Sequence, residues 1–231
     1  MTATITEPGV YQIPEDDYHA DPVIGGSLSS TGARKLLPPS CPALYRHWAD
    51  NPEQTSKEFD VGHAAHAQVL GTGPEIAVLD YDSWRTNAVK ADAEEARAAG
   101  KVPLLAKEHA PLAGMVAALR AHPWTSQILA PGTGVAEQTL IWRDGESGVW
   151  CRARLDHIHH RQPGRRLVVV DYKTTVSAAP EDLDRTIYRY GYHVQAAHYL
   201  DAVQALGLAP DGVLYLLIFQ EKTAPYLPTV V

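Results

Sequence analysis

The pattern of apolar and polar residues changes near residue 135. Before that point apolar residues recur at helical spacing, which favours α-helices. A first helix is expected to begin at residues 28–31, where a serine can act as N-cap, and to end before Pro38-Pro39. Further helices are expected at residues 43–49, 59–71, 83–99 and 112–121. Residues 1–26 are rich in acids and turn formers and are expected to form an irregular lead-in.

After residue 135 the chain alternates apolar and polar positions, as strands do. Strands are expected at residues 137–142, 149–158, 167–174 and 213–219, with one long helix at residues 183–206. This order predicts an α/β protein, a central mixed sheet flanked by helices, with a helical N-terminal part. No linker is visible, so we expect a single domain over residues 1–231.

Composition narrows the possible functions. The 231 residues are 45% hydrophobic and carry a formal net charge of −7, which excludes a generally basic nucleic-acid coat. Residues 152–189 nevertheless hold eight lysines and arginines against five acids. Two cysteines are too few for a four-cysteine metal site and indicate reduced thiols, as in the cytoplasm. No signal peptide and no apolar run of about 20 residues is visible, so no membrane segment is expected.

Charged residues follow a buried run in the third predicted strand. Asp171 and Lys173 come directly after three valines, and strand alternation places both side chains on one face. Charges at the end of a buried strand are costly to place. An acid-x-lysine triplet can also occur by chance at the solvent end of a strand, although this one is unique in the chain.

The preceding strand carries a second carboxylate, Asp156. A turn at Pro163-Gly164 folds this strand back beside Asp171, so the two carboxylates can share a divalent cation. Oxygen ligands suit Mg²⁺ or Mn²⁺. The alternative is a surface ladder of ion pairs formed by Asp156 with Arg152 and Arg154.

Histidines offer further candidates for metal ligands. His63 and His66 lie three residues apart among alanines on one predicted helix, so they share a face. A single histidine in such a place is commonly a core residue bonded to the backbone. His157, His159 and His160 follow Asp156, but alternation sends His157 and His159 to the opposite face, so they are expected to end the strand.

The long predicted helix carries one polar aromatic stripe. Tyr188, Tyr192, Gln195 and Tyr199 recur at helical spacing. An aromatic core stripe with hydroxyl groups at its rim would explain the tyrosines. It would not explain Gln195 in their midst, whereas a nearby phosphate or ligand would.

The ordered set of these residues resembles the RecB-type branch of the PD-(D/E)XK nucleases, and within it the RecE-type exonuclease domain of the exodeoxyribonuclease VIII family. The resemblance spans nearly the whole chain. It is carried by these stretches: Leu28-Ser29-Ser30-Thr31, Pro42-Ala43-Leu44-Tyr45, Gly62 to His66, Cys151 to Asp156, Val170 to Thr175, Tyr190 to Tyr199, and Ala224-Pro225-Tyr226.

The resemblance implies a role for each matched residue. His66, Asp156 and Asp171 would ligate the metal, with the Tyr172 carbonyl as a further ligand. His66, rather than His63, fits the Gly-x-x-x-His spacing from Gly62. Lys173 would position or deprotonate the attacking water.

The resemblance extends to the helix beside the site and to the strand before it. Gln195 and Tyr199 match a Gln-x-x-x-Tyr element, and Glu137 is a candidate for an acidic residue of the preceding strand. DNA contacts are expected in the basic region, at Arg152, Arg154, Arg185, Arg189 and Tyr192.

The family implies an Mg²⁺- or Mn²⁺-dependent deoxyribonuclease that degrades linear double-stranded DNA in the 5′-to-3′ direction during recombination or repair. It also implies a phage or bacterial setting, a single-strand annealing partner and a toroidal homo-oligomer. The chain ends soon after Pro225-Tyr226, where relatives usually continue, which puts the oligomer in doubt. The alternatives are a RecB-type nuclease for single-stranded DNA, a non-catalytic DNA-binding module, and a hydrolase of small phosphoesters.

Overall fold

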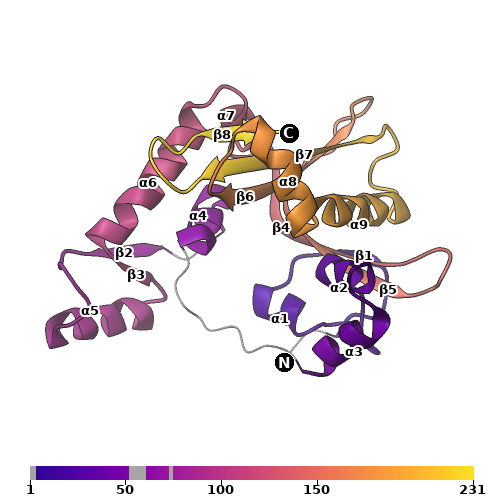
Figure 1. Cartoon of the computed structure of the whole chain (residues 1–231), viewed down its shortest axis with the longest axis horizontal. Helices are drawn as coiled ribbons and strands as arrows, with labels where there is room; N and C mark the ends of the chain where they lie inside the picture. Colours follow the sequence, from indigo (N-terminus) through magenta and orange to yellow (C-terminus); the bar gives the residue numbers. More distant parts are fainter. Residues whose placement is uncertain (1–3, 52–60, 73–74) are drawn as a thin grey trace. The chain divides into compact units, whose positions relative to one another are not determined.

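The computed structural model describes residues 4–51, 61–72 and 75–231, with the backbone alone for residues 61–65. Figure 1 shows the elements in chain order. They are β1 (Gly9–Tyr11), α1 (Glu15–His19), α2 (Ser30–Leu36), α3 (Pro42–Asp50), α4 (Val61–Leu70), β2 (Ile76–Leu79), α5 (Asn87–Ala98), β3 (Val102–Leu105), α6 (Ala106–Ala121), α7 (Thr125–Ile128), β4 (Gly134–Arg143), β5 (Trp150–His159), β6 (Leu167–Thr175), α8 (Pro180–Tyr190), α9 (Tyr192–Ala205), β7 (Val213–Glu221) and β8 (Pro228–Val230).

The chain forms two compact units. Unit 1 comprises Met1–Lys57, Gly132–Asp171 and Pro180–Leu216, and unit 2 comprises Glu58–Pro131, Tyr172–Ala179 and Leu217–Val231. The predicted α/β class is confirmed, since strands in the order β1-β4-β5-β6-β7-β8 form one six-stranded sheet and helices accompany it. The expectation of a single domain stays a prediction.

The core of unit 1 lies between α9 and the antiparallel pair β4–β5. Their register puts Leu140 opposite Ala153, and both side chains are fully buried. Ala202 and Val203 of α9 belong to the same apolar cluster. Helix α2 lies against α9 and begins as predicted, because the Ser29 hydroxyl accepts a hydrogen bond from the Gly32 amide. This packing fixes α9 over the strands that carry the candidate site.

Unit 2 contains a second, two-stranded sheet, in which β2 and β3 are parallel. Helix α6 buries Leu112, Met115 and Leu119. The chain approaches α6 closely at Gly114, where any Cβ atom would overlap the ring of Tyr226. Among the helices of the described ranges, none combines the length and apolar character needed to cross a membrane.

Three expectations about elements were wrong. The lead-in contains strand β1 and helix α1, and the short strands β2 and β3 were not expected. The single helix over residues 183–206 is two helices, because Gly191 adopts a left-handed conformation with φ of 70°. That break places Tyr188 on α8, apart from Gln195 and Tyr199 on α9, so the four-residue stripe is not continuous.

Candidate functional site

The two aspartates predicted as metal ligands occupy adjacent strands of unit 1. In the antiparallel pair β5–β6, His157 lies opposite Val170 and Ile158 opposite Val169. The next position in this register places Asp156 across from Asp171. Both side chains are buried, with 8% of Asp156 and none of Asp171 exposed. The strands therefore set two carboxylates side by side, as the sequence predicted.

Gln195 of α9 contacts one of these carboxylates directly. Its side-chain amide donates a hydrogen bond of 2.9 Å to Asp171 Oδ1, and it lies 3.0 Å from the Tyr199 hydroxyl. Gln195 and Tyr199 are four residues apart, so they share a face of the helix. The break at Gly191 begins α9 at Tyr192, about one turn before Gln195.

Burial and the two aspartates raise the pKa of two nearby tyrosines. The pKa of Tyr199 is raised well above its ordinary value, mainly by burial and then by the charges of Tyr18, Asp171 and Asp156. The pKa of Tyr215 is raised by burial and by the same two aspartates. The Tyr215 hydroxyl is buried and makes no hydrogen bond within the described residues. Both aspartates thus act on the same two tyrosine hydroxyls.

Glu137, the candidate acidic residue of the preceding strand, lies on β4. The β4–β5 register pairs Ala136 with His157 and Gln138 with Leu155, which leaves Glu137 facing Asp156. Glu137 has a left-handed backbone with φ of 55°, unusual for a residue within a strand. Its carboxylate forms an ion pair of 2.5 Å with Arg154 Nε. That ion pair offsets the charge of Glu137 and gives it a structural contact within unit 1.

The two arginines predicted to bind DNA on β5 make contacts within unit 1. Arg152 Nη1 lies 2.6 Å from Asp21 Oδ2 and donates to the carbonyl of Ser27. Arg154 Nη1 donates to the carbonyl of Ile13, in addition to its ion pair with Glu137. Both arginines thus contact the N-terminal segment, and Arg154 also contacts Glu137. These contacts assign both arginines a structural role, and their role in DNA binding stays a prediction.

The other predicted site residues on α4 and β6 belong to unit 2. Lys173 is partly buried and follows Asp171 by two residues on β6, so strand alternation gives both the same face. His66 is partly buried, and its ring centroid lies 6.0 Å from that of Tyr172. The side chain of His63 lies outside the described residues.

Tyr172 anchors β6 within unit 2. Its hydroxyl donates a hydrogen bond of 2.6 Å to Gln220 Oε1 on β7. The amide of Gln220 donates to the carbonyls of Met115 and Tyr226. Tyr172 and Gln220 are almost completely buried, and the hydrogen bonds satisfy both polar groups. Residue 172 is therefore held firmly between the two charged positions of β6.

The histidines after Asp156 end the strand, as expected. β5 ends at His159, and His157 is buried with Nε2 3.1 Å from the Thr133 hydroxyl. Burial, together with His159 and His160, lowers the pKa of His157 to about 4. These contacts give His157 a structural explanation.

A metal site is not visible as a ready-made cluster. Within residues 4–51, 61–72 and 75–231, no three histidine, cysteine or acidic side chains gather closely enough to hold an ion. The three predicted ligands are divided, with Asp156 and Asp171 in unit 1 and His66 in unit 2. The donor set itself, two buried carboxylates in an anionic region, fits a hard divalent cation.

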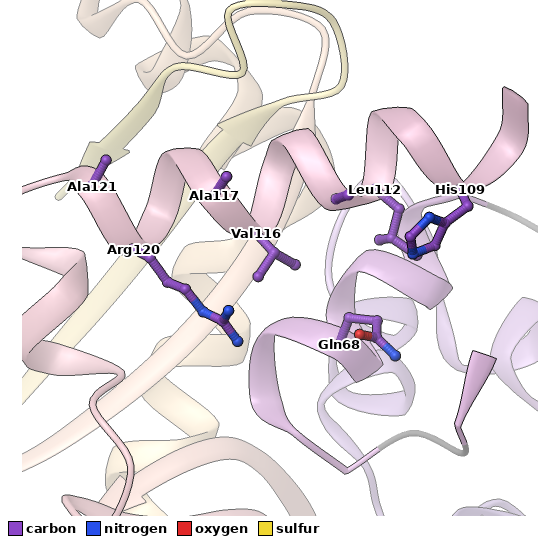
Figure 2. Close-up of a pocket in the computed structure, with 8 residues that line it drawn as sticks. Gln68, His109, Leu112, Val116, Ala117, Arg120 and Ala121 are labelled. Atoms are coloured by element: carbon purple, nitrogen blue, oxygen red, sulfur yellow. The ribbon is translucent and has the colours of Figure 1, made fainter. Parts of the chain in front are cut away.

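Unit 2 also has a pocket. Its volume is about 590 Å³, and Figure 2 shows it between α6 and Gln68 of α4. On α6 it is lined by His109, Leu112, Ala113, Val116, Ala117, Arg120 and Ala121. Gln68 follows His66 by two residues, so on a helix the two side chains point in nearly opposite directions. None of the predicted site residues lines this pocket.

A protein-family model matches residues 40–220, which include every site residue predicted from the sequence. Its description is "PDDEXK-like domain of unknown function (DUF3799)". The chain belongs to this PDDEXK-like family. The sequence-based expectation of a PD-(D/E)XK protein is thereby confirmed at the level of the superfamily, while the RecE-type assignment stays a prediction.

Solved structures show the same fold. A protein from Eubacterium rectale, described as "Putative exonuclease", matches with a TM-score of 0.56 and 12% sequence identity. The match covers 96% of this PDDEXK-like chain and 77% of the other. A comparison with curated proteins gave no significant match.

Sequence reasoning missed Tyr215 and Gln220. Tyr215 looks like an ordinary aromatic residue of an apolar strand, and its neighbours Asp156 and Asp171 are distant in sequence. Gln220 could have been noticed in the sequence, because it is a polar residue that directly follows the apolar run 213–219. A buried amide at the end of such a run indicates a hydrogen-bond network.

Proposed function

We propose that the protein is a divalent-cation-dependent phosphodiester hydrolase that acts on DNA. The observation that carries the proposal is the placement of Asp156 beside Asp171, with Gln195 bonded to Asp171 at 2.9 Å. Membership of a PDDEXK-like family supports nuclease activity. Carboxylates that can hold a metal ion, with a lysine on the same strand, suit metal-assisted hydrolysis of a phosphodiester.

Asp156 and Asp171 would hold Mg²⁺ or Mn²⁺, and His66 and the Tyr172 carbonyl stay predicted further ligands. A bound divalent cation stabilises the negative charge that develops on the phosphate and lowers the pKa of water. Gln195 orients the Asp171 carboxylate through its hydrogen bond. The hydroxyl of Tyr199, protonated because its pKa is raised, contributes a neutral partner for Gln195.

Lys173 is the group proposed to act on the attacking water. It shares the Asp171 face of β6, where it would supply positive charge or take a proton from the attacking water. Water oxygen attacks phosphorus, the P–O bond to the leaving nucleotide breaks, and the leaving oxygen acquires a proton. The products are a phosphate monoester and a hydroxyl group.

The finer proposal is an exonuclease that degrades linear double-stranded DNA from its 5′ ends, in a recombination or repair setting. Its support is the family resemblance of the sequence, which also suggests a single-strand annealing partner and a ring-shaped homo-oligomer. The E. rectale relative is described as an exonuclease only in its own name. The direction of degradation, the DNA substrate and the protein partners are therefore part of the proposal.

The test is digestion of end-labelled linear duplex and closed circular DNA at low salt, with Mg²⁺ or with EDTA. Lys173→Ala is compared with wild type, and Lys90→Ala on α5 is the matched control because Lys90 is an exposed lysine outside the site. We expect wild type and the control to degrade linear DNA only with Mg²⁺, and Lys173→Ala to lose at least ~100-fold.

Other outcomes would contradict particular parts of the proposal. Cleavage of circles would remove the exonuclease assignment and keep the nuclease. Turnover of a small phosphodiester without any cleavage of DNA would favour a small-molecule hydrolase. DNA binding without cleavage, unchanged by Lys173→Ala, would favour a non-catalytic module and contradict the proposal.

A further inference from the structure

The junction of α8 and α9 in unit 1 exposes aromatic rings to solvent. Tyr188 is 79% exposed and Tyr190 is 50% exposed, which is unusual for two tyrosines within three residues. His193 is also exposed, and Tyr192 is partly buried. We call these four residues, Tyr188, Tyr190, Tyr192 and His193, the aromatic corner. Figure 1 shows the chain changing direction there, between α8 and α9.

The rings of the aromatic corner form two parallel pairs that join the helices. Tyr188 and His193 stack with centroids 5.6 Å apart and ring planes inclined by 2°. Tyr190 and Tyr192 stack with centroids 5.7 Å apart and planes inclined by 22°. Parallel rings with exposed faces offer flat surfaces on which a further planar group can stack.

The backbone of the aromatic corner is fixed by contacts from α2. Gly191 has φ of 70°, and a Cβ atom there would overlap the Arg34 side chain. The guanidinium of Arg34 donates a hydrogen bond to the Tyr190 carbonyl. The aromatic rings are therefore presented by a constrained turn, which lowers the entropy lost when a ligand binds.

Positive charge accompanies the rings. Arg185 and Arg189 are exposed on α8, and the Arg189 guanidinium lies 5.7 Å from the centre of the Tyr190 ring. The acids of α8, Glu181, Asp182 and Asp184, precede both arginines, so the end of α8 beside the aromatic corner carries the basic residues. Aromatic faces beside arginines suit a ligand with planar bases on a phosphate backbone.

The aromatic corner lies close to the carboxylates of unit 1 along α9. Tyr192 precedes Gln195 by three residues, a rise of about 4.5 Å on an α-helix, and residues at this spacing share a face. Gln195 in turn contacts Asp171. The α9 end of the aromatic corner, Tyr192, therefore lies about one helical turn from the residue that contacts Asp171.

We propose that unpaired nucleobases of the DNA substrate stack on the aromatic corner, with Tyr188 and Tyr190 as the main contacts. The stacking proposal rests on the proposed function, since it names the part of the DNA substrate that the protein binds. The chemistry recognised is the flat face of an unpaired base, so a single-stranded end binds without regard to sequence.

The experiment measures binding of two fluorescent 20-nucleotide probes in EDTA, where no cleavage is expected. One probe is oligo(dT), and the other has the same backbone with abasic residues. Wild type is compared with the double variant Tyr188→Ala/Tyr190→Ala and with Tyr188→Phe/Tyr190→Phe, which keeps the rings. Trp124→Ala is the control for loss of an exposed aromatic elsewhere, because Trp124 is 67% exposed and belongs to unit 2.

We expect wild type to bind oligo(dT) about tenfold more tightly than the abasic probe. The alanine variant should bind oligo(dT) as weakly as the abasic probe, with its abasic affinity unchanged. The phenylalanine variant and Trp124→Ala should behave like wild type. Arg185→Ala and Arg189→Ala should lower the affinity for both probes equally and make binding less dependent on salt concentration.

Equal binding of the two probes by wild type would overturn the stacking proposal, and DNA cleavage by that protein would keep the proposed function. Preference for oligo(dT) without cleavage in Mg²⁺ would support stacking and contradict the nuclease. Absence of both binding and cleavage would overturn both. Loss of self-association in the alanine variant, with both affinities unchanged, would assign the aromatic corner to a protein contact and also overturn the proposal.

Discussion

Asp171 and Tyr172 are neighbours on β6, and both are buried, yet their surroundings differ in kind. Asp171 is next to a second carboxylate, and its contact to Gln195 is a single amide hydrogen bond. Tyr172 ends in a neutral network in which Gln220 satisfies its hydroxyl and two backbone carbonyls. Like charges held together reduce stability, whereas a satisfied neutral network increases it.

The surroundings of Asp171 suit a catalytic role, whereas those of Tyr172 hold β6 in place. Enzymes commonly accept lower stability at a catalytic site and recover it nearby. Substitutions on the Asp171 side should therefore change activity with little loss of stability. Substitutions on the Tyr172 side should reduce the free energy of unfolding.

The largest expected effect is on activity at the carboxylates. Asp156→Asn and Asp171→Asn should each lower the rate of DNA cleavage by at least ~100-fold, because each removes a charged oxygen ligand. Their unfolding temperatures without metal should equal or exceed that of wild type, since like-charge repulsion is relieved. Activity assays and thermal melts measure both. A large fall in unfolding temperature would show that these carboxylates serve the fold instead.

The next effect tests the Tyr172 side. Gln220→Leu leaves the Tyr172 hydroxyl and the carbonyls of Met115 and Tyr226 without their partner, so the free energy of unfolding should fall by about 2 kcal/mol. Urea denaturation measures it. Gln204→Leu, at an exposed position of α9, is the matched control and should change stability by less than ~0.5 kcal/mol. Equal stability of the two variants would refute the structural role of Gln220.

A smaller effect is expected at the hydrogen bond between Gln195 and Asp171. Gln195→Ala should lower kcat by about tenfold with little change in KM, because a hydrogen bond to a charged group is lost. Gln204→Ala on the same helix should leave both constants unchanged. An increase in KM alone would indicate that Gln195 binds DNA and does not orient Asp171.

The smallest expected effect is on how stability depends on pH, which should differ between His198 and the Tyr172 network. His198 on α9 is buried with Nε2 3.1 Å from the Arg152 carbonyl, and burial lowers its pKa below the ordinary value. The unfolded chain therefore takes up a proton near pH 6.5 that the folded chain resists, so stability falls as the pH drops through this range. His198→Gln should reduce the fall in unfolding temperature between pH 7 and pH 5.

The Tyr172 network should not share this dependence. The pKa of an unfolded tyrosine is about 10, and burial raises the pKa of Tyr172 further, so its hydroxyl stays neutral from pH 5 to pH 7 in both states. The destabilisation caused by Gln220→Leu should therefore be the same at both pH values. A destabilisation that changes between pH 5 and pH 7 would mean that a titrating group is part of the network.

The sequence predicted the elements that depend on local pattern. The main strands follow from alternation, and the start of α2 follows from the Ser29 cap. The break at Gly191 was missed because a single glycine is tolerated within a helical pattern, and its conformation depends on Arg34 of another helix. The strands β2 and β3 were missed because each has only four residues.

The candidate site was predictable where strand geometry alone was needed. Asp156 and Asp171 lie on neighbouring strands as the turn between them implied, and Gln195 was noticed as a polar residue in an aromatic stripe. The contacts of Arg152 were not predictable, because its partner Asp21 is 131 residues away in sequence. The same holds for Gln220, whose partners come from β6 and α6.

The central claim, that Asp156 and Asp171 hold a divalent cation, is tested most directly by calorimetric titration of Mn²⁺ into the metal-free protein. Wild type is compared with Asp171→Asn and with Asp16→Asn, the same substitution at an exposed residue of α1. The account predicts saturable binding by wild type and Asp16→Asn, and loss of that binding in Asp171→Asn. Equal binding by all three proteins, or none by wild type, would contradict it.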